Sequence, residues 1–374
     1  MITIKSFKSL NLISLVDKES FRSDLLSWYD RNKRDLPWRG CGDPYKIWIS
    51  EIMLQQTRVD QVIPYYYRFI NRFPTVHDLA EAGLQEVLKV WEGLGYYSRA
   101  RNLHHAAKTV AERFNGLIPD TWDEIKELKG IGPYSASAIL SIAFGRPYAV
   151  VDGNVIRVLA RFFGIETDVR KATTKNLIQG YADELLDPGR PGDFNQALME
   201  LGATVCTPSS PGCQNCPLGS RCAARAIART DTIPYKSPAK KKPHHQIGVG
   251  VLKNNQGEVL IAHRPENAML GGLWEFPGGK QKETEGIMET VIRELREELG
   301  IEARIIRPLM KLDHTYSHFK ITLHAFICEL VSGEPKPNAS QQIKWVPVDE
   351  LDQYPFPKAN RRITDKLMSM YNGQ

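Results

Sequence analysis

The sequence lacks any apolar run as long as the roughly 20 residues that cross a bilayer as a helix. Its first 16 residues also lack the continuous apolar stretch and the small-residue cleavage site of a secretory signal peptide. We therefore expect a cytoplasmic protein with no membrane partner.

Cysteine is scarce, and six cysteines in 374 residues do not indicate a disulfide framework in a reducing compartment. Cys41 and Cys328 stand alone and are expected to be buried thiols. The other four share one segment with the spacing C-x6-C-x2-C-x5-C: Cys206, Cys213, Cys216 and Cys222. The Pro and Gly residues between them allow tight turns, so four thiolates can meet at one centre. The spacing alone is compatible with zinc or with an iron-sulfur cluster.

Neither sign of charge dominates, because 49 basic and 43 acidic residues leave a net charge of only +6. This balance is compatible with a polyanionic partner but does not identify one. Hydrophobic residues make up 42% of the chain and charged residues 25%, which excludes a disordered polar chain. At roughly 150 residues per domain, the length predicts two or three domains.

Two regions of different periodicity are separated by a basic segment rich in proline. Residues 21–228 have the pattern of helices between short Gly, Pro and Asp turns. Residues 232–245 contain three prolines and a lysine run, typical of a linker that is either a plain spacer or a contact for phosphates. We therefore predict an all-α domain over 1–230, a linker over 231–245 and an α+β domain over 246–374.

Within the α+β region, three segments have the residue types of strands and one has the pattern of a helix. The predicted strands are 247–252, 259–262 and 320–329, the first two joined by an Asn-Asn-Gln-Gly turn. The predicted helix covers 286–299.

A short turn in the helical region could bind a phosphate. Gly130 and Gly132 allow a tight turn, and Pro133 suits the first position of the next helix. The unpaired N–H groups of that helix start can receive an anion. An ordinary helix connection would use the same residues.

Two carboxylates have sequence contexts that are compatible with cleavage of a glycosidic bond. Asp152 precedes the helical stripe that begins at Val155, where it could cap the helix or stabilise an oxocarbenium-like sugar. On a helix, Glu51 has Ile47, Trp48 and Leu54 as neighbours. Burial among these side chains should raise the pKa of Glu51 and keep its proton available near neutral pH.

Together these motifs resemble the MutY-type adenine DNA glycosylases of the endonuclease III, or helix-hairpin-helix, superfamily. The similarity rests on Ser50–Thr57 (S-E-I-M-L-Q-Q-T), the 128–138 hairpin, Val151–Val155 (V-D-G-N-V) and the cysteine spacing. The resemblance implies that the cysteines hold a 4Fe-4S cluster, that Glu51 protonates adenine and that Asp152 stabilises the sugar cation. It also implies a bacterial, nucleoid-associated monomer acting in base excision repair on double-stranded DNA with an adenine:8-oxoguanine or adenine:guanine mispair.

Further roles follow from the same resemblance. Tyr134 occupies the place where strand-cleaving relatives have a Schiff-base lysine, so a monofunctional glycosylase is expected, with Tyr134 positioning Asp152 and the sugar. Tyr96 resembles the intercalating residue. Other residues expected to contact DNA or the extruded base are Arg34, Leu36, Trp38, Arg39, Gln56, Thr57, Gly130, Gly132 and Asn154.

The C-terminal region resembles Nudix domains through the full box from Gly279 to Ile301. Its carboxylates Glu285, Glu294, Glu297 and Glu298 could bind a divalent metal or survive only as a scaffold. MutY-type enzymes recognise 8-oxoguanine with a Phe-Ser-His loop, and the similar segment here is Tyr316, Ser317 and His318.

Three other functions remain open at this level. An endonuclease III type enzyme is opposed by Tyr134 and by the second domain. A Nudix pyrophosphatase would use the helical region only as a tether, and a mismatch-binding protein without activity would not need Glu51 in an apolar setting.

Overall fold

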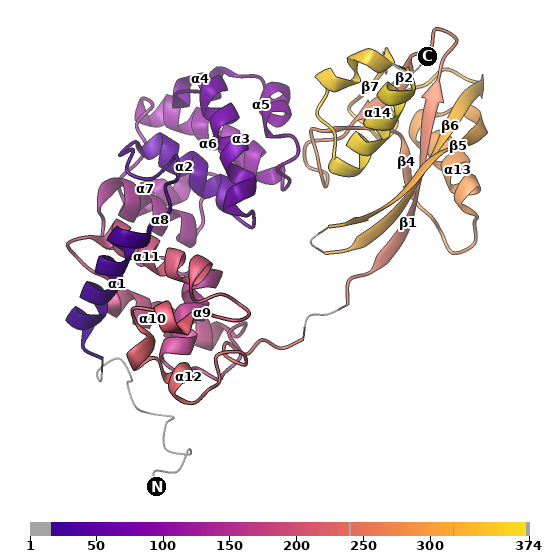
Figure 1. Ribbon diagram of the computed structural model, residues 1–374. Helices are drawn as coiled ribbons and strands as arrows, with labels where there is room; N and C mark the ends of the chain where they lie inside the picture. The colour runs from indigo at the N-terminus through magenta and orange to yellow at the C-terminus, as the bar shows by residue number, and fades with distance from the viewer. Residues whose placement is uncertain (1–15, 239–240, 317, 372–374) are drawn as a thin grey trace. The chain divides into compact units, whose positions relative to one another are not determined.

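The computed structural model describes residues 16–238, 241–316 and 318–371 (Figure 1). The chain divides into two units: residues 1–66 with 109–239, and residues 67–108 with 240–374. The C-terminal domain thus shares its unit with a helical segment from the N-terminal half. Nothing in the sequence pattern predicts that grouping.

The first unit is helical, as predicted. Its helices are α1 (Lys18–Asn32), α2 (Pro44–Leu54), the start of α3 (Val59–Arg72), the end of α6 (Ser98–Phe114), α7 (Trp122–Glu127), α8 (Pro133–Phe144), α9 (Gly153–Phe162), α10 (Ala172–Leu185), α11 (Pro191–Thr204) and α12 (Ala223–Ala226). Short 3-10 turns η3 (Cys213–Asn215) and η4 (Gly219–Arg221) lie in the cysteine segment. Phe21 packs on Phe162 and Phe194 in the core between α1, α9 and α11.

Local sequence signals set the ends of the helices that carry the site. Asp43 caps α2 by accepting hydrogen bonds from Tyr45 N and Lys46 N, with Pro44 at the first position. In the same way Pro133 begins α8, which ends at Gly145 in the left-handed conformation. These caps fix the start of α2 ahead of Glu51 and the start of α8 beside the predicted hairpin.

The second unit combines helices with one mixed sheet of seven strands. Its helices are the end of α3, α4 (Val76–Glu81), α5 (Leu84–Trp91), most of α6, α13 (Ile287–Leu299), η5 (Val348–Gln353) and α14 (Lys358–Tyr371). Its strands are β1 (His244–Lys253), β2 (Val259–His263), β3 (Trp274–Glu275), β4 (Gly278–Lys280), β5 (Glu302–Thr315), β6 (Lys320–Ser332) and β7 (Gln342–Val346). The main order is β3-β2-β1-β6-β5, with β4 on β1 and β7 on β2; β1 and β6 pair in parallel, and the other pairs of described strands are antiparallel.

Apolar residues on both faces of the sheet explain why helices cover it. Val291 and Leu295 of α13 join the core on one face, and Ile363 of α14 joins the core that contains Trp274 and Phe276. On β1, a Cβ at Gly250 would lie 2.9 Å from the Leu295 side chain, so glycine permits the close approach of α13.

The predicted strands and helix are confirmed, but the short strands β3 and β4, the strands β5 and β7 and the helix α14 were not predicted. Most of β5 is partly or fully exposed, and its pairing with β6 is interrupted by bulges around Pro308. Such a strand has no clean alternation of apolar and polar residues. The prediction for Cys328 is confirmed because it is buried, whereas that for Cys41 was wrong because Cys41 is exposed. No helix among the described residues is long and apolar enough to cross a membrane.

Candidate active site

Glu51 is a buried carboxyl group with a raised pKa, as its helical neighbours predicted. It lies in the last turns of α2, and only 5% of its surface is exposed. Burial raises the pKa of Glu51 to about 7, the negative charge of Asp152 acts in the same direction, and a hydrogen bond from Tyr134 opposes them. Near neutral pH this group can therefore donate a proton.

Tyr134 lies in the first turn of α8 and contacts Glu51. Its hydroxyl donates to Glu51 Oε2 at 3.3 Å and lies 3.6 Å from the sulfur of Met199. Burial raises the pKa of Tyr134 well above its usual value, and the Glu51 charge adds to this effect. The phenol is therefore a neutral hydrogen-bond donor that holds the carboxyl group in place.

Asp152 caps α9 and borders the same cavity as Glu51. Its Oδ1 accepts hydrogen bonds from the backbone N–H groups of Asn154 at 2.8 Å and Val155 at 2.7 Å, and its Oδ2 accepts one from the Asn154 side chain at 2.8 Å. Burial raises the pKa of Asp152, although these hydrogen bonds oppose the shift. Helix capping thus orients the carboxylate, so capping and a chemical role are compatible.

The cavity has a volume of about 160 Å³ and gathers most of the residues predicted for the site. The predicted residues on its wall are Arg34, Leu36, Trp38, Arg39, Glu51, Thr57, Tyr134, Asp152 and Asn154. Residues on the wall that were not predicted are Ile47, Ser50, Leu54, Val59, Ile142, Gln196, Met199, Glu200 and Ala203. Its wall combines apolar side chains with three carboxyl groups and two arginines, which suits a flat ring that can be protonated and hydrogen-bonded at its edge.

Glu200 is the most informative residue that sequence reasoning missed. Its side chain is 1% exposed and binds Arg34 Nε and Arg39 Nη2, each at 2.6 Å. Burial alone would raise the pKa of Glu200, but the hydrogen bonds from the two arginines outweigh it and lower the pKa. The cavity therefore holds two carboxyl groups with raised pKa values, Glu51 and Asp152, and a third, Glu200, that stays ionised. Glu200 lies among buried apolar residues of α11, which is the same sequence signal that indicated Glu51 on α2.

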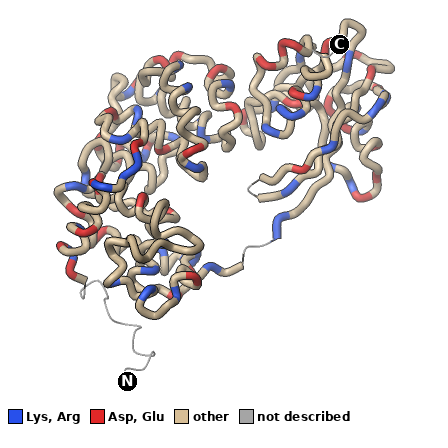
Figure 2. The backbone as a smooth tube through the Cα atoms, viewed as in Figure 1, with Lys and Arg blue, Asp and Glu red and all other residues tan. Residues whose placement is uncertain are grey.

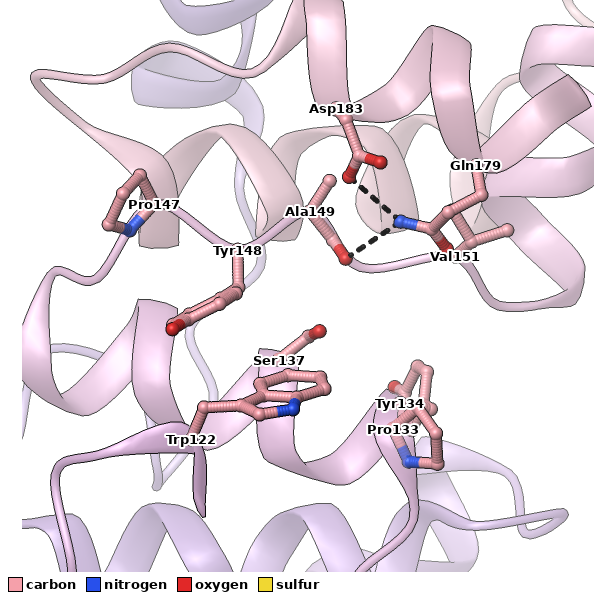
Figure 3. Close-up of a pocket in the computed structure, with 10 residues that line it drawn as sticks. All are labelled: Trp122, Pro133, Tyr134, Ser137, Pro147, Tyr148, Ala149, Val151, Gln179 and Asp183. Carbon is pink, nitrogen blue, oxygen red and sulfur yellow. Dashed lines mark hydrogen bonds between the residues drawn. The ribbon is translucent and has the colours of Figure 1, made fainter. Parts of the chain in front are cut away.

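A second cavity of about 630 Å³ shares Tyr134 with the first (Figure 3). Trp122 and Tyr148 stack within it at 4.8 Å between ring centres. On another side, Gln179 donates to Asp183 at 2.9 Å and to Ala149 O at 3.4 Å. Glu51 and Asp152 belong to the lining of the first cavity and not of this one. The first cavity is therefore the candidate site of chemistry.

The four cysteines Cys206, Cys213, Cys216 and Cys222 line one small cavity. Burial and the neighbouring thiols raise the pKa of Cys216 to about 11, and burial raises that of Cys222. Four thiolates here therefore need a cationic centre to offset their charges. In the part of the chain that the structure describes, no three His, Cys, Asp or Glu side chains are arranged to hold a single metal ion.

Two arginines connect the cysteine segment to α9. Arg157 donates to Cys206 O at 2.7 Å and to Asn154 Oδ1 at 2.8 Å. Arg161 donates to Thr207 O at 2.7 Å and lies 3.3 Å from the sulfur of Cys206. Because Asn154 binds Asp152, the position of the cysteine segment is linked to the position of that carboxylate.

The predicted phosphate-binding turn lies between α7 and α8. Gly130 has a φ of 88°, which favours glycine, whereas Gly132 caps α8 with an ordinary φ of −94°. After α2, Gln56 adopts a φ of 57°, and Thr57 N donates to Leu54 O at 3.2 Å. Gly130, Gly132 and Gln56 are not part of the cavity wall described above.

The remaining predicted contacts lie in the second unit. Tyr96 is 40% exposed at the turn between α5 and α6, with a φ of 51°. Tyr316 follows β5, and its ring lies 4.8 Å from Phe319 and 4.6 Å from His314. His318 is exposed, and Ser317 lies outside the described residues.

The Nudix-box carboxylates are bound to groups of the protein itself. Arg293 pairs with Glu285 and Glu294, each at 2.7 Å, and with Glu297 at 2.9 Å. Glu298 accepts a hydrogen bond from Gly278 N at 3.0 Å. These contacts hold Gly278 and Glu285, which precede the helix, against α13.

Basic and acidic residues are interspersed along both units (Figure 2). Near the cysteines, Arg221 pairs with Asp24, Arg229 pairs with Glu166, and Arg225 donates to Cys213 O at 3.0 Å. These arginines therefore support the local structure of the cysteine segment.

Comparisons with known families agree with this combination of fold and site. The model of the HhH-GPD superfamily of base excision DNA repair proteins matches residues 49–182, and the NUDIX domain model matches residues 248–366. A solved thermostable thymine-DNA glycosylase is 30% identical and has a TM-score of 0.51, covering 56% of this chain and 97% of its own. The fold and site thus define a helix-hairpin-helix DNA glycosylase with a Nudix-like domain.

Two relatives that match more than nine tenths of this chain identify the family more closely. The adenine DNA glycosylase of Homo sapiens is 36% identical over 95% of this chain and 74% of its own length. That of Schizosaccharomyces pombe is 33% identical over 92% of this chain and 88% of its own length. The chain belongs to the MutY-type adenine DNA glycosylases, enzymes of base excision repair.

Proposed function

We propose that this enzyme removes adenine from duplex DNA where it is mispaired with 8-oxoguanine or guanine, without efficient strand cleavage. The observation that carries the proposal is the buried Glu51, whose pKa of about 7 keeps a proton available near neutral pH in a cavity shared with Asp152. Adenine is a poor leaving group until a ring nitrogen is protonated, so an acid at this position meets the main chemical need.

The proposed reaction proceeds in two steps. Glu51 gives its proton to adenine as the N-glycosidic bond breaks, and the bonding electrons leave with the base. The negative charge of Asp152, held by Asn154 and Val155, stabilises the cation left on the sugar. Water then adds to the sugar carbon and loses a proton, which restores Glu51. Tyr134 keeps Glu51 in place and supplies no amine, so the products are adenine and an abasic site.

Access to adenine requires that the base leave the helix. We propose that Tyr96 fills the gap, that Gln56 and Thr57 contact the opened strand, and that the Gly130 and Gly132 turn binds a phosphate. Cavity residues that would contact the extruded base or its sugar are Arg34, Leu36, Trp38, Arg39 and Asn154. Tyr316, Ser317 and His318 would contact the opposite 8-oxoguanine.

The cysteines are proposed to hold a 4Fe-4S cluster, which would stabilise the segment that positions α9. A single zinc ion needs four sulfurs at about 2.3 Å from one centre. A larger cluster accepts thiolates around a wider space, as the common cavity of the four cysteines allows. The purified protein should contain about four iron and four sulfide per chain. Cys216→Ser should lose them, whereas Cys41→Ser should not; bound zinc would overturn the proposal.

We propose that residues 1–230 carry the glycosylase chemistry, that residues 231–245 form a linker and that residues 246–374 recognise the base opposite adenine. Residues 67–108 pack with the last of these parts. We propose a monomer that works at the bacterial nucleoid. Sedimentation in the presence and absence of duplex DNA tests the oligomeric state.

Single-turnover release of adenine opposite 8-oxoguanine, guanine and thymine tests the function directly. Fast release opposite 8-oxoguanine, lost in Glu51→Gln, is the expected result. Absence of release from every duplex, or efficient strand cleavage at the abasic product, would contradict the proposal.

A further inference from the structure

The corner between α5 and α6 is joined to the C-terminal segment within the second unit. Glu92 follows α5, and its Oε1 accepts three hydrogen bonds from that segment. The donors are Phe356 N at 2.8 Å, Arg361 Nε at 2.9 Å and Arg361 Nη2 at 2.5 Å. One carboxylate oxygen thus connects two parts of the chain that are more than half its length apart in sequence.

This junction is well shielded from solvent. The side chains of Glu92 and Arg361 are 14% and 16% exposed. Arg361 also lies over the Phe356 ring at 5.2 Å and donates to Tyr354 O at 2.7 Å. A shielded ion pair with this many hydrogen bonds has one favoured geometry. Glu92 also pairs with Lys89 at 2.8 Å and Arg361 with Asp352 at 3.2 Å, so removing one partner breaks the hydrogen bonds at Glu92 Oε1 while the remaining charge keeps one ionic partner.

The same junction holds the turn that carries Tyr96. The Tyr97 hydroxyl accepts from Gly93 N and donates to Phe356 O, each at 3.2 Å. Glu92 immediately precedes the turn, and Tyr97 immediately follows Tyr96. The backbone on both sides of Tyr96 is therefore fixed by contacts to the C-terminal segment.

We propose that Glu92 and Arg361 are positioning residues that couple recognition of the base opposite adenine to the insertion of Tyr96. This inference rests on the proposed function, in which the C-terminal domain recognises that base and Tyr96 fills the gap. If the C-terminal domain shifts on binding 8-oxoguanine, the hydrogen bonds of Glu92 and Tyr97 to the C-terminal segment would move the turn that carries Tyr96. Glu92 and Arg361 would then affect base discrimination without contacting either base.

The test uses the full-length protein with its metal centre. Single-turnover adenine release is measured opposite 8-oxoguanine and opposite guanine for wild type, Glu92→Gln, Arg361→Met and Arg361→Lys. We expect Glu92→Gln and Arg361→Met to reduce the ratio of the two rate constants by about tenfold, within the range of couplings between contacting residues. Arg361→Lys, which keeps the positive charge but loses the forked guanidinium, should retain part of the ratio that Arg361→Met loses. Arg296→Met, which removes an exposed pair with Glu302 on α13, is the matched control and should leave the ratio unchanged.

Hydrogen exchange in the free protein provides a readout that does not depend on activity. Amides of residues 93–99 should exchange about tenfold faster in Glu92→Gln, whereas those of α13 should not change. Unchanged exchange at residues 93–99 would overturn the inference whatever the activity. If wild type releases adenine faster opposite 8-oxoguanine than opposite guanine, and Glu92→Gln has the same ratio of rate constants, the inference also fails while the proposed function stands. If wild type itself releases no adenine or does not discriminate, the proposed function fails, and the exchange result still decides whether the junction holds the turn.

Discussion

Replacing Glu51 by glutamine should remove activity and at the same time stabilise the protein. Burial raises the pKa of Glu51 from 4.5 to about 7, so the folded protein holds this proton after the unfolded chain has lost it. The contribution of Glu51 to the free energy of unfolding is therefore fully present below pH 4.5, where the group is protonated in both states, and is lost as the pH rises through 7. At roughly 1.4 kcal/mol per pKa unit, the loss amounts to about 3 kcal/mol.

Glutamine keeps the size of the side chain and an oxygen that can accept the Tyr134 hydroxyl, but it never ionises. Glu51→Gln should exceed wild type in free energy of unfolding by about 3 kcal/mol at pH 8 and by less than about 1 kcal/mol at pH 5. Urea unfolding of both proteins at pH 5, 6, 7 and 8 measures the difference.

Glu200→Gln is a matched control because it changes a buried carboxylate on the wall of the same cavity. Arg34 and Arg39 hold the pKa of Glu200 below its usual range, so the ionised form of Glu200 stabilises the fold. The change in the free energy of unfolding should therefore have the opposite sign to that of Glu51→Gln. At pH 8 this substitution leaves two arginines without their partner and should cost about 2 to 4 kcal/mol. If Glu51→Gln is no more stable than wild type at pH 8, the desolvation of Glu51 is refuted, and with it the physical basis for its role as an acid.

Three further predictions concern the same site. The single-turnover rate of adenine release should fall about fivefold from pH 7 to pH 8 and about tenfold per unit beyond, as Glu51 loses its proton; a flat profile to high pH would contradict this. Asp152→Asn should keep the helix cap, leaving the free energy of unfolding within about 1 kcal/mol of wild type, yet slow release by about 100-fold or more; unchanged release would exclude Asp152 from the chemistry. Gly202→Ala places a Cβ 2.6 Å from that of Asn154 and should destabilise the fold by about 1 to 3 kcal/mol in urea titrations, whereas Gly180→Ala, with no atom within 4 Å, should be neutral or slightly stabilising.

The sequence predicted much of the site because several of its signals are local. The spacing of Ile47, Trp48 and Leu54 around Glu51 was enough to predict a shielded carboxyl group, since neighbours on one helix are fixed by its period. The position of Asp152 before an apolar stripe predicted its cap for the same reason. The strand β5 was not predicted because its own sequence has no regular alternation of apolar and polar residues. Its bulged pairing with β6 keeps it in the sheet.

By itself, then, the sequence determined the helical and α+β regions, the helix α2 that carries Glu51, the helix cap Asp152 and the cysteine segment. Each of these depends on residues that are close to one another in the sequence. Only the tertiary structure decided that Glu200 of α11 binds Arg34 and Arg39 on the cavity wall, and that Glu92 binds Arg361. These ion pairs join residues more than 160 positions apart. No periodicity encodes such partners, because packing of distant elements brings them together and burial then makes their charges depend on each other.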